Sequence, residues 1–350
     1  MLKTALIGFG QVAEKAHVPA WKESKDFTVV AVADESPERL AIAAEYFPGV
    51  RTYPSMESLL RGEPHLDLVD IATPPFLHSK QVVLALQHRC HVLCEKPLAL
   101  NLKDFESIRA QANAQERTVF TVHNWKYSPL FLQTMQIVKA GEIGAIAHVE
   151  LHTLRDQPAA NAPGVAGTWR TDRVMSGGGI LVDHGWHNFY LLRRLLGQEP
   201  RMVSARLTVP SYGGVEEQAT CFIEYPGATA LLFLTWRAPH RANWGMVYGQ
   251  EGAIEMRDDV LLVTRRGLPQ PQRFEFAQKL SQGSAHPDWF QTMLEDLKTE
   301  IQKPKLRHQN LREAEGCLGL LSHIYQSHRL GGKSIALPTS GLPRGETIGT

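Results

Sequence analysis

The chain has 350 residues, a length at which a single hydrophobic core usually gives way to two domains. Its 37 basic and 36 acidic residues leave a formal net charge of +1, so the composition indicates neither a nucleic acid nor a charged membrane surface as a partner. No apolar run in the sequence reaches the length that spans a bilayer, the four cysteines are too few for a disulfide framework, and no secretory leader is recognisable. We therefore expect a cytoplasmic, globular protein.

The first third of the chain alternates short β-branched runs with longer helical runs, which is typical of parallel βαβ units. The expected strands are residues 4–7, 28–33, 68–72, 91–94 and 119–122. The expected helices are residues 12–23, 37–47, 78–88 and 102–115. We therefore assign residues 1–122 to a Rossmann domain, a doubly wound parallel sheet with five predicted strands.

The pattern changes after residue 122. A helix is expected at 130–139, a strand at 147–155, a loop at 156–167 and a second helix that ends at Gly197. The later strands follow one another with short connections, at 202–209, 219–225, 229–236, 245–249, 253–256 and 261–265. Because parallel neighbours need a long crossover, short connections predict antiparallel pairing. We expect a large, mostly antiparallel open sheet with helices on one face, two of them at 289–301 and 311–328.

These elements assign residues 123–340 to a C-terminal α/β domain for substrate binding and oligomerisation, and residues 341–350 to a tail. A single open sheet must cover its second face, which favours association between copies. Phe222, Phe233 and Trp236 are candidates for that cover, although they could equally be core residues beneath the helices.

A glycine-rich turn follows the first predicted strand and leads into a helix. It reads Gly8-Phe9-Gly10-Gln11-Val12-Ala13, a G-x-G-x-x-A pattern. Gly8 permits a tight turn, Gly10 lets a pyrophosphate approach the backbone, and Ala13 allows close packing of the helix. The turn predicts binding of a dinucleotide; a glycine turn without that function is the alternative.

Asp34 ends the second predicted strand, about 20 residues beyond the turn, where a carboxylate accepts hydrogen bonds from the adenosine ribose. Asp34 and Glu35 together would repel a 2′-phosphate, and Arg39 would offset them only by folding back. The expected cofactor is therefore NAD, with NADP possible.

The segment Cys94-Glu95-Lys96-Pro97 ends another predicted strand of the Rossmann domain. Since ligands of open α/β sheets bind beyond the carboxyl ends of the strands, Glu95 and Lys96 are expected in the cofactor crevice. A lysine there can hydrogen-bond a substrate hydroxyl and stabilise the charge of a developing alkoxide. A solvated ion pair is the alternative interpretation.

A second group of polar residues follows the glycine run 177–179. Asp183 and His187 are four residues apart, so in an α-helix they share a face and can hydrogen-bond. This pairing would orient the imidazole as a general base. Two alternatives remain: a pair that satisfies itself in the core, and a metal site formed with His184. We expect no metal, because no further ligand is evident in the sequence.

Together these motifs resemble the Gfo/Idh/MocA family, named after glucose-fructose oxidoreductase and inositol dehydrogenase. The resemblance covers most of the chain and also includes the segment Thr73-Pro74 to His78. It implies that Lys96, Asp183 and His187 are the catalytic set. It further implies that the open face of the C-terminal sheet is commonly the oligomer interface.

The resemblance and the motifs give the expected cofactor contacts Gly8, Phe9, Gly10, Gln11, Val12, Asp34, Glu35, Thr73, Pro74, His78, Glu95 and Lys96. The expected substrate contacts are Lys96, Asn124, Lys126, Trp169, Arg170, Asp183 and His187. Lys126 stands where the family frequently has arginine, and Pro75 where asparagine is common.

The predicted function is hydride transfer between NAD and a hydroxyl-bearing carbon of a sugar, polyol, inositol or related compound, in a homodimer or homotetramer. Two alternatives stay open. One is an NAD-dependent, redox-neutral glycoside hydrolase or lyase, and the other is a non-catalytic ligand sensor.

Overall fold

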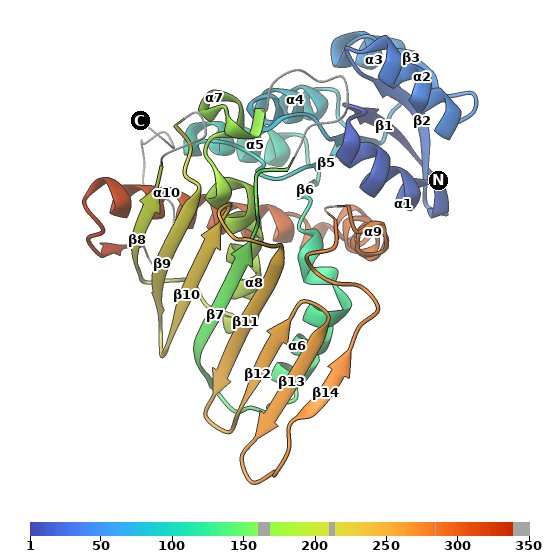
Figure 1. Ribbon diagram of the computed structural model, residues 1–350. Coiled ribbons are helices and arrows are strands. Elements are labelled where there is room, and N and C mark those ends of the chain that lie inside the picture. The colour runs from blue at the N-terminus through green and yellow to red at the C-terminus, as the bar shows by residue number, and fades with distance from the viewer. Residues whose placement is uncertain (160–168, 210–213, 284, 339–350) are drawn as a thin grey trace. The chain divides into compact units, whose positions relative to one another are not determined.

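The computed structural model describes residues 1–159, 169–209, 214–283 and 285–338, which form two compact units, each with a sheet of its own (Figure 1). Unit 1 contains residues 1–124 and 285–315, and unit 2 contains the other described residues. None of the helices in the described ranges is long and apolar enough to cross a membrane.

Unit 1 is built on a parallel sheet. Its strands in the described part of the chain are β1 (Leu2–Ile7), β2 (Phe27–Ala33), β3 (Arg51–Tyr53), β4 (Leu68–Ile71), β5 (His91–Cys94) and β6 (Val119–Thr121). They lie in the order β3-β2-β1-β4-β5-β6, and every pair is parallel. The predicted Rossmann sheet is confirmed. Because the strand order reverses between β1 and β4, the carboxyl ends of these two strands flank the crevice in which such folds bind ligands.

The helices of unit 1 lie between and after these strands. They are the π-helical turn η1 (Ala13–His17), α1 (Val18–Glu23), α2 (Pro37–Tyr46), α3 (Met56–Gly62), α4 (Pro75–Gln87), α5 (Leu102–Ala114), α9 (Pro287–Gln302) and the 3-10 turn η5 (Pro304–Leu306). Helix α9 comes from the last fifth of the chain and packs on α1 and η1, with the Phe290 ring 4.2 Å from the His17 ring.

The sequence prediction of five strands in this sheet is wrong by one, because β3 and the following α3 were missed. β3 has only three residues and lies at the edge of the sheet, too short to show a periodicity. The start of α3 did carry a signal, a capping box: the Ser55 side chain accepts a hydrogen bond from the Ser58 backbone N–H, and the Ser58 side chain accepts one from the Ser55 backbone N–H.

Unit 2 contains the larger sheet. Its strands in the described ranges are β7 (Ile146–Leu154), β8 (Met202–Thr208), β9 (Gln218–Tyr225), β10 (Ala228–Thr235), β11 (Ala242–Gly249), β12 (Gly252–Arg257), β13 (Val260–Arg265), β14 (Gln272–Glu275) and β15 (Ile335–Ala336). They lie in the order β14-β13-β12-β11-β7-β10-β9-β8-β15. Only β7 and β10 pair in parallel. The prediction of a mostly antiparallel sheet is confirmed, and the short strands β14 and β15 extend it at both edges.

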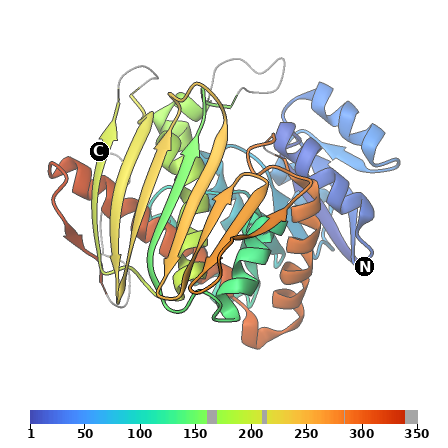
Figure 2. The same ribbon diagram turned by 60° about the horizontal axis from the view of Figure 1, so that its bottom comes forward.

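Helices cover one face of this sheet: α6 (Pro129–Lys139), α8 (Trp186–Leu196) and the C-terminal part of α10 (Gln309–Arg329) (Figure 2). The remaining turns are η2 (Asn124–Tyr127), η3 (Trp169–Thr171), α7 (Arg173–Ser176) and η4 (Leu181–Gly185). Polar contacts tie the helices to strands: Asn188 of α8 donates to Thr153 at 3.1 Å, and Ser327 of α10 accepts from the Ala205 backbone at 2.9 Å.

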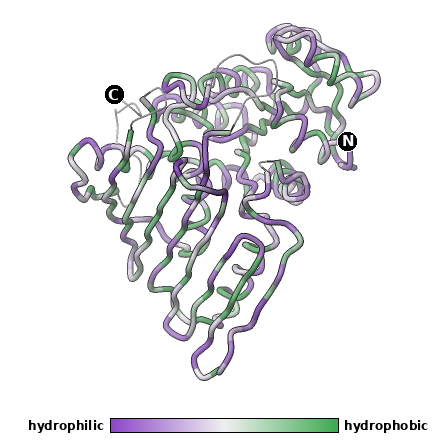
Figure 3. The backbone as a smooth tube through the Cα atoms, in the orientation of Figure 1, coloured by the Kyte–Doolittle hydropathy of each residue, from purple (hydrophilic) through white to green (hydrophobic). Residues whose placement is uncertain are grey.

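Burial alternates along the strands of unit 2, as expected when one face is covered and the other is open. In β9, Cys221 and Ile223 are buried, whereas Phe222 between them is 40% exposed. Figure 3 shows hydrophilic and hydrophobic residues following one another along these strands.

Aromatic rings cross the face that the helices do not cover. The pairing of β11, β7 and β10 places Trp244, His152 and Phe233 side by side, with the His152 ring 4.5 Å from Trp244 and 6.0 Å from Phe233. Trp236, by contrast, is 1% exposed. It is therefore a core residue and does not belong to this face.

Candidate active site

The glycine-rich turn lies at the end of β1, beside the turn that follows β4. Gly8 has φ +84°, and a Cβ there would lie 2.8 Å from Thr73 Cγ2 and 3.1 Å from the Ala72 backbone. Gly10, in contrast, has no heavy atom of the described residues within 4 Å of the position of a Cβ. Gly8 is thus required by the packing of the two turns, whereas Gly10 leaves its backbone open to a ligand.

Asp34 is fixed against this turn. Its carboxylate accepts hydrogen bonds from the Phe9 backbone N–H at 2.7 Å and from the Ser36 backbone N–H at 2.8 Å. Each carboxylate oxygen keeps a second acceptor site, which suits the hydroxyls of a ribose. Ala13 is fully buried and Phe9 is buried beneath the turn, while Gln11, Val12 and Glu35 are at least partly exposed.

The turn after β4 is braced to the segment after β5. His78 is fully buried, with Nδ1 2.7 Å from the Pro97 carbonyl and Nε2 2.7 Å from the Thr73 carbonyl. Burial lowers the pKa of His78 below its usual value, against the effect of the two carbonyls. Thr73 and Pro74 are partly exposed at the start of α4. His78 therefore links the two segments that carry Thr73 and Lys96.

Glu95 and Lys96 follow β5, and the Glu95 carboxylate is bound on both sides. It accepts a hydrogen bond from the Lys96 backbone N–H at 3.1 Å and lies 3.1 Å from His17 Nε2. The other nitrogen of His17 lies 2.8 Å from the buried Asp70, which also accepts a hydrogen bond from Trp21 at 2.7 Å. A buried chain of charged groups therefore runs from Asp70 through His17 to the backbone of Lys96.

The charge state of this chain follows from its geometry. Burial by itself would lower the pKa of His17, but the charge and hydrogen bond of Asp70, together with Glu95, raise it to about 9. The imidazolium in turn holds the pKa of Glu95 below its usual value, in spite of burial. His17 is thus a cation between two carboxylates at neutral pH.

In unit 2, the glycine run before Asp183 lets two other segments approach closely. A Cβ on Gly179 would lie 1.9 Å from the Glu216 carbonyl, and one on Gly178 would lie 2.0 Å from Tyr325 Oη. The buried Glu216 carboxylate accepts hydrogen bonds from Tyr325 Oη at 2.8 Å and from the Leu181 backbone at 3.1 Å. Burial raises the pKa of Glu216. Glu216 and Tyr325 therefore fix the start of the helix that carries Asp183 and His187.

That helix differs from the regular α-helix expected from the sequence. Asp183 lies in the π-helical turn η4, and His187 lies in the first turn of α8. The wider π turn changes the angle between residues four apart, so the assumption of regular α-helical spacing is wrong here. A hydrogen bond between Asp183 and His187 stays a prediction.

His187 is 7% exposed and is held by two aromatic residues. Its ring stacks on the Trp125 ring at 4.4 Å with an interplanar angle of 6°, and its Nδ1 lies 2.7 Å from Tyr190 Oη. Tyr190 Oη also accepts a hydrogen bond from the Trp125 backbone N–H at 3.0 Å. These contacts fix both the plane of the imidazole and the partner of its Nδ1 atom.

Asp183 lies beside His184, with Asp183 Oδ2 3.2 Å from His184 Nδ1. The 1% exposed Arg155 donates to His184 Nε2 at 3.2 Å, and its other donors meet the Leu154 and Ala242 carbonyls and Asn243. Since a guanidinium only donates, His184 Nε2 must accept, so the imidazole proton is on Nδ1, facing Asp183. Burial lowers the pKa of Arg155 to about 10, so the group remains charged at neutral pH.

The other predicted substrate contacts lie in two short 3-10 turns, η2 and η3. Asn124 and Lys126 are buried in η2, and the Lys126 ammonium lies 5.4 Å from the Tyr127 ring centroid. Trp169 and Arg170 form η3, with the guanidinium 4.3 Å from the centroid of the Trp169 ring. Most of the predicted loop 156–167 lies outside the described residues, which resume at Trp169.

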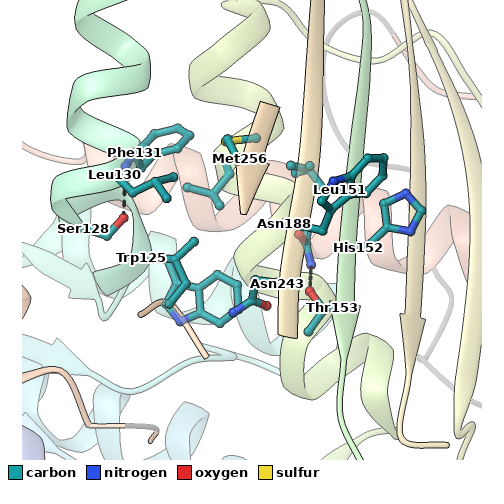
Figure 4. Close-up of a pocket in the computed structure, with 14 residues that line it drawn as sticks. Trp125, Ser128, Leu130, Phe131, Leu151, His152, Thr153, Asn188, Asn243 and Met256 are labelled. Atoms are coloured by element: carbon teal, nitrogen blue, oxygen red, sulfur yellow. Dashed lines mark hydrogen bonds between the residues drawn. The ribbon is translucent and has the colours of Figure 1, made fainter. Parts of the chain in front are cut away.

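A pocket lies between the sheet and helices α6 and α8 of unit 2 (Figure 4). Trp125, which stacks on His187, forms one of its walls, and the hydrogen-bonded pair Asn188 and Thr153 forms part of another. The other lining side chains are mostly apolar, among them Leu130, Phe131, Leu151, Leu191 and Met256. The pocket adjoins His187 through Trp125 and Asn188.

Several of these residues were missed from the sequence. His17, Asp70, Glu216, Tyr190 and Tyr325 come from elements distant from the motifs or give no pattern of their own. The close succession of Gly178 and Gly179 was the one signal that another segment approaches. No group of three or more His, Cys, Asp or Glu side chains within the described ranges could hold a metal ion.

Unit 1 has a parallel sheet and a glycine turn bound to Asp34, and unit 2 has an open, mostly antiparallel sheet; this is the architecture of a protein with a dinucleotide-binding domain and a second domain. Residues 2–123 match the model of the oxidoreductase family with an NAD-binding Rossmann fold, and residues 131–255 match that of the GFO/IDH/MocA C-terminal domain. The chain therefore belongs to the Gfo/Idh/MocA family of NAD-binding oxidoreductases, which confirms the resemblance seen in the sequence.

Named relatives extend this comparison. The chain is 26% identical to inositol 2-dehydrogenase of Rhizobium meliloti over 287 residues, covering 79% of this chain and 82% of the relative. It is 28% identical to myo-inositol 2-dehydrogenase of Thermotoga maritima over 204 residues, covering 58% of each. Among solved structures, levoglucosan dehydrogenase in complex with NADH superposes with a TM-score of 0.84 at 20% identity, covering 97% of this chain and all of that one. At that identity the likeness concerns the fold.

Proposed function

We propose that the protein is an NAD-dependent dehydrogenase that acts on a hydroxyl-bearing carbon of a sugar, polyol, inositol or related compound. The observation that carries the proposal is the anchored imidazole of His187, a titratable group held between Tyr190 and Trp125, the second of which also lines a pocket. The two sequence relatives named above, which are dehydrogenases of inositols, support this substrate class.

The residues of unit 1 fit NAD. The open backbone at Gly10 suits a pyrophosphate, and the free acceptor sites of Asp34 suit the ribose. The proposed contacts are the turn Gly8 to Val12, Asp34 with Glu35, Thr73 with Pro74, and Glu95 with Lys96; His78 supports Thr73 from below. When bound, NAD supplies the acceptor for a hydride from the substrate carbon.

The proposed catalytic residues are Lys96 of unit 1 and Asp183 and His187 of unit 2. With Nδ1 donating to Tyr190, His187 Nε2 accepts the proton of the substrate hydroxyl as the C–H bond breaks. The Lys96 ammonium donates a hydrogen bond to the same oxygen and stabilises its negative charge. The Asp183 carboxylate favours the protonated form of the imidazole. In the reverse direction His187 returns the proton.

Four further side chains are proposed to contact the substrate. Asn124 and Lys126 offer an amide and an ammonium to hydroxyl groups, and Trp169 with Arg170 offers a ring face and donors. Stacking on an aromatic ring and several hydrogen bonds are the usual means of holding a polyhydroxylated ligand.

The direct test is a panel of sugars, inositols and sugar acids with NAD, followed both by NADH absorbance and by product analysis. The expected result is formation of NADH in step with an oxidised product. Product without net NADH would instead identify a redox-neutral hydrolase or lyase, and no turnover of any compound would contradict the proposal.

The role of Lys96 is tested with Lys96→Met, which keeps the length of the side chain but removes its charge. We expect kcat/KM to fall about 100-fold or more, because a donor to a developing oxyanion is typically worth that much. NADH affinity should change much less. A loss of only a few fold would show that Lys96 has another role.

The roles of the two domains and the formation of a homo-oligomer are also proposals. We assign dinucleotide binding to residues 1–122 and substrate binding to the part of residues 123–340 that lies in unit 2. Helix α9, which was predicted from the sequence to lie with the C-terminal sheet, lies in unit 1. The row Trp244, His152 and Phe233, with Phe222 nearby, supports homo-oligomerisation through the uncovered face of the unit 2 sheet. All four cysteines are buried reduced thiols, which supports a cytoplasmic location.

A further inference from the structure

Arg39 contacts the same residue, Phe9, as Asp34, the carboxylate that would receive the adenosine ribose. It is in the first turn of α2, which the Ser36 side chain caps by accepting from the Arg39 backbone N–H. Its Nε donates to the Phe9 carbonyl at 2.6 Å, and the guanidinium lies 5.6 Å from the centroid of the Phe9 ring. The N–H of the same Phe9 donates to Asp34. Arg39 and Asp34 thus hold the two ends of one residue of the glycine turn.

Glu14 occupies the other side of this guanidinium. Arg39 Nη2 donates to Glu14 Oε2 at 2.6 Å, and Tyr46 Oη donates to Glu14 Oε1 at 3.3 Å. The Arg39 and Glu14 side chains are 17% and 23% exposed, so solvent screens this pair only in part. The phenol of Tyr46 keeps the carboxylate in place.

We infer that Glu14 is a specificity determinant for the cofactor, because it occupies the guanidinium of Arg39 that would otherwise bind the 2′-phosphate of NADP. A nearby arginine is the usual means by which a Rossmann domain accepts that phosphate, through parallel N–H donors. Here the guanidinium is neutralised by one carboxylate and has two of its nitrogens engaged. A 2′-phosphate would then meet Asp34 and Glu35 without a compensating cation.

This inference depends on the NAD binding of the family and is independent of the substrate. It implies that the chain already contains a cation for a 2′-phosphate, and that the ion pair with Glu14 keeps this cation from offsetting the charges of Asp34 and Glu35. Release of Arg39 should therefore raise the affinity for NADPH without any new residue, while Asp34 still binds the ribose of NADH.

The test is a fluorescence titration of the purified protein with NADH and with NADPH, so that the readout is binding and not turnover. The release variant is Glu14→Gln, which keeps the shape of the side chain and removes its charge. We expect the Kd for NADPH to fall about tenfold and the Kd for NADH to stay within about twofold. Glu14→Ala is the second release variant, to be used should the first be poorly folded.

Two controls separate the ion pair from a general change in charge. Glu45→Gln removes the same charge from the exposed side of α2 and should leave both affinities unchanged. The double variant Glu14→Gln/Arg39→Met should lose the gain for NADPH. A ratio of affinities that changes less than about twofold in both release variants, or a gain that survives without Arg39, would overturn the inference. Failure of the wild-type protein to bind either dinucleotide would contradict the proposed function instead.

Discussion

Tyr190 is the partner of His187 Nδ1 in the proposed mechanism. Its hydroxyl accepts from the Trp125 backbone and lies 2.7 Å from His187 Nδ1, and we propose that Nδ1 donates in this contact, so that Nε2 remains the acceptor. This hydroxyl has no counterpart among the residues singled out from the sequence, because a tyrosine within an apolar helix has the pattern of a core residue.

We expect Tyr190→Phe to lower kcat/KM by about 10- to 100-fold, because the imidazole loses the partner that selects its tautomer. The pH at which activity rises should also shift, whereas NADH affinity, which is proposed to reside in unit 1, should not change. Tyr225→Phe removes another buried phenol, on β9, and should leave the pH profile unchanged. Equal profiles for wild type and Tyr190→Phe would exclude this role.

His17 gives unit 1 a pH dependence of stability. A group whose pKa rises on folding, here from 6.5 to about 9, stabilises the fold fully below pH 6.5. That contribution is lost as the pH rises from 6.5 through 9 and would be on the order of 3 kcal/mol for a shift of this size.

Chemical denaturation of the wild-type protein at pH 7 and at pH 9.5 measures this loss. In His17→Gln, which cannot be protonated, the free energy of unfolding should be lower at pH 7 and should depend much less on pH across the same interval. An equally steep dependence in the variant would show that other groups cause it.

At the scale of elements, Gly179 and Gly10 both belong to glycine-rich segments, but the structure requires glycine at the two positions for different reasons. A methyl group on Gly179 would lie 1.9 Å from the Glu216 carbonyl, whereas one on Gly10 would meet no atom of the described residues within 4 Å. Packing against Glu216 therefore excludes a side chain at Gly179, whereas at Gly10 it is the proposed cofactor that would need the space.

Gly179→Ala should therefore lower the free energy of unfolding by on the order of 3 kcal/mol, because backbone must move to make room. Gly10→Ala should leave the stability of the cofactor-free protein unchanged and should weaken NADH binding instead. Thermal melts and NADH titrations of both variants test the contrast, and a stable Gly179→Ala protein would contradict the steric argument.

Helices and strands were predicted correctly where the run of residues was long or strongly periodic. The prediction failed where contacts with distant residues determine the local backbone structure. β1, β2 and α2 were placed to within a few residues. β3, by contrast, is ordered by its pairing with β2, and the π turn η4 follows Gly179, which packs on Glu216. Neither cause is visible in a local pattern of residues.

At the scale of the whole molecule, the uncovered sheet face is the feature to test. We expect Phe222→Asp to shift the protein toward monomers in light scattering at micromolar concentration, because it places a charge on an apolar interface. Leu132→Asp is the matched control, since Leu132 is 41% exposed and lies on α6, on the helix side of the sheet. A wild-type protein that is already monomeric would contradict the proposed assembly.

The sequence by itself determined the class of the protein. The glycine turn, Asp34, Glu95-Lys96-Pro97 and the Asp183 to His187 segment are local patterns whose meaning depends on chain neighbours, so they could be read before any fold was known. The alternation of strand-like and helical runs likewise predicted the first sheet, and the short connections between later strands predicted the second, since both are read along the chain.

The tertiary structure decided which groups meet across long stretches of chain. His17 with Asp70, Glu216 with Tyr325, and Arg39 with Glu14 are separated in the sequence by 25 to 109 positions. Hydrogen bonds and ion pairs act over about 3 Å, and only the folded backbone brings such residues to that distance.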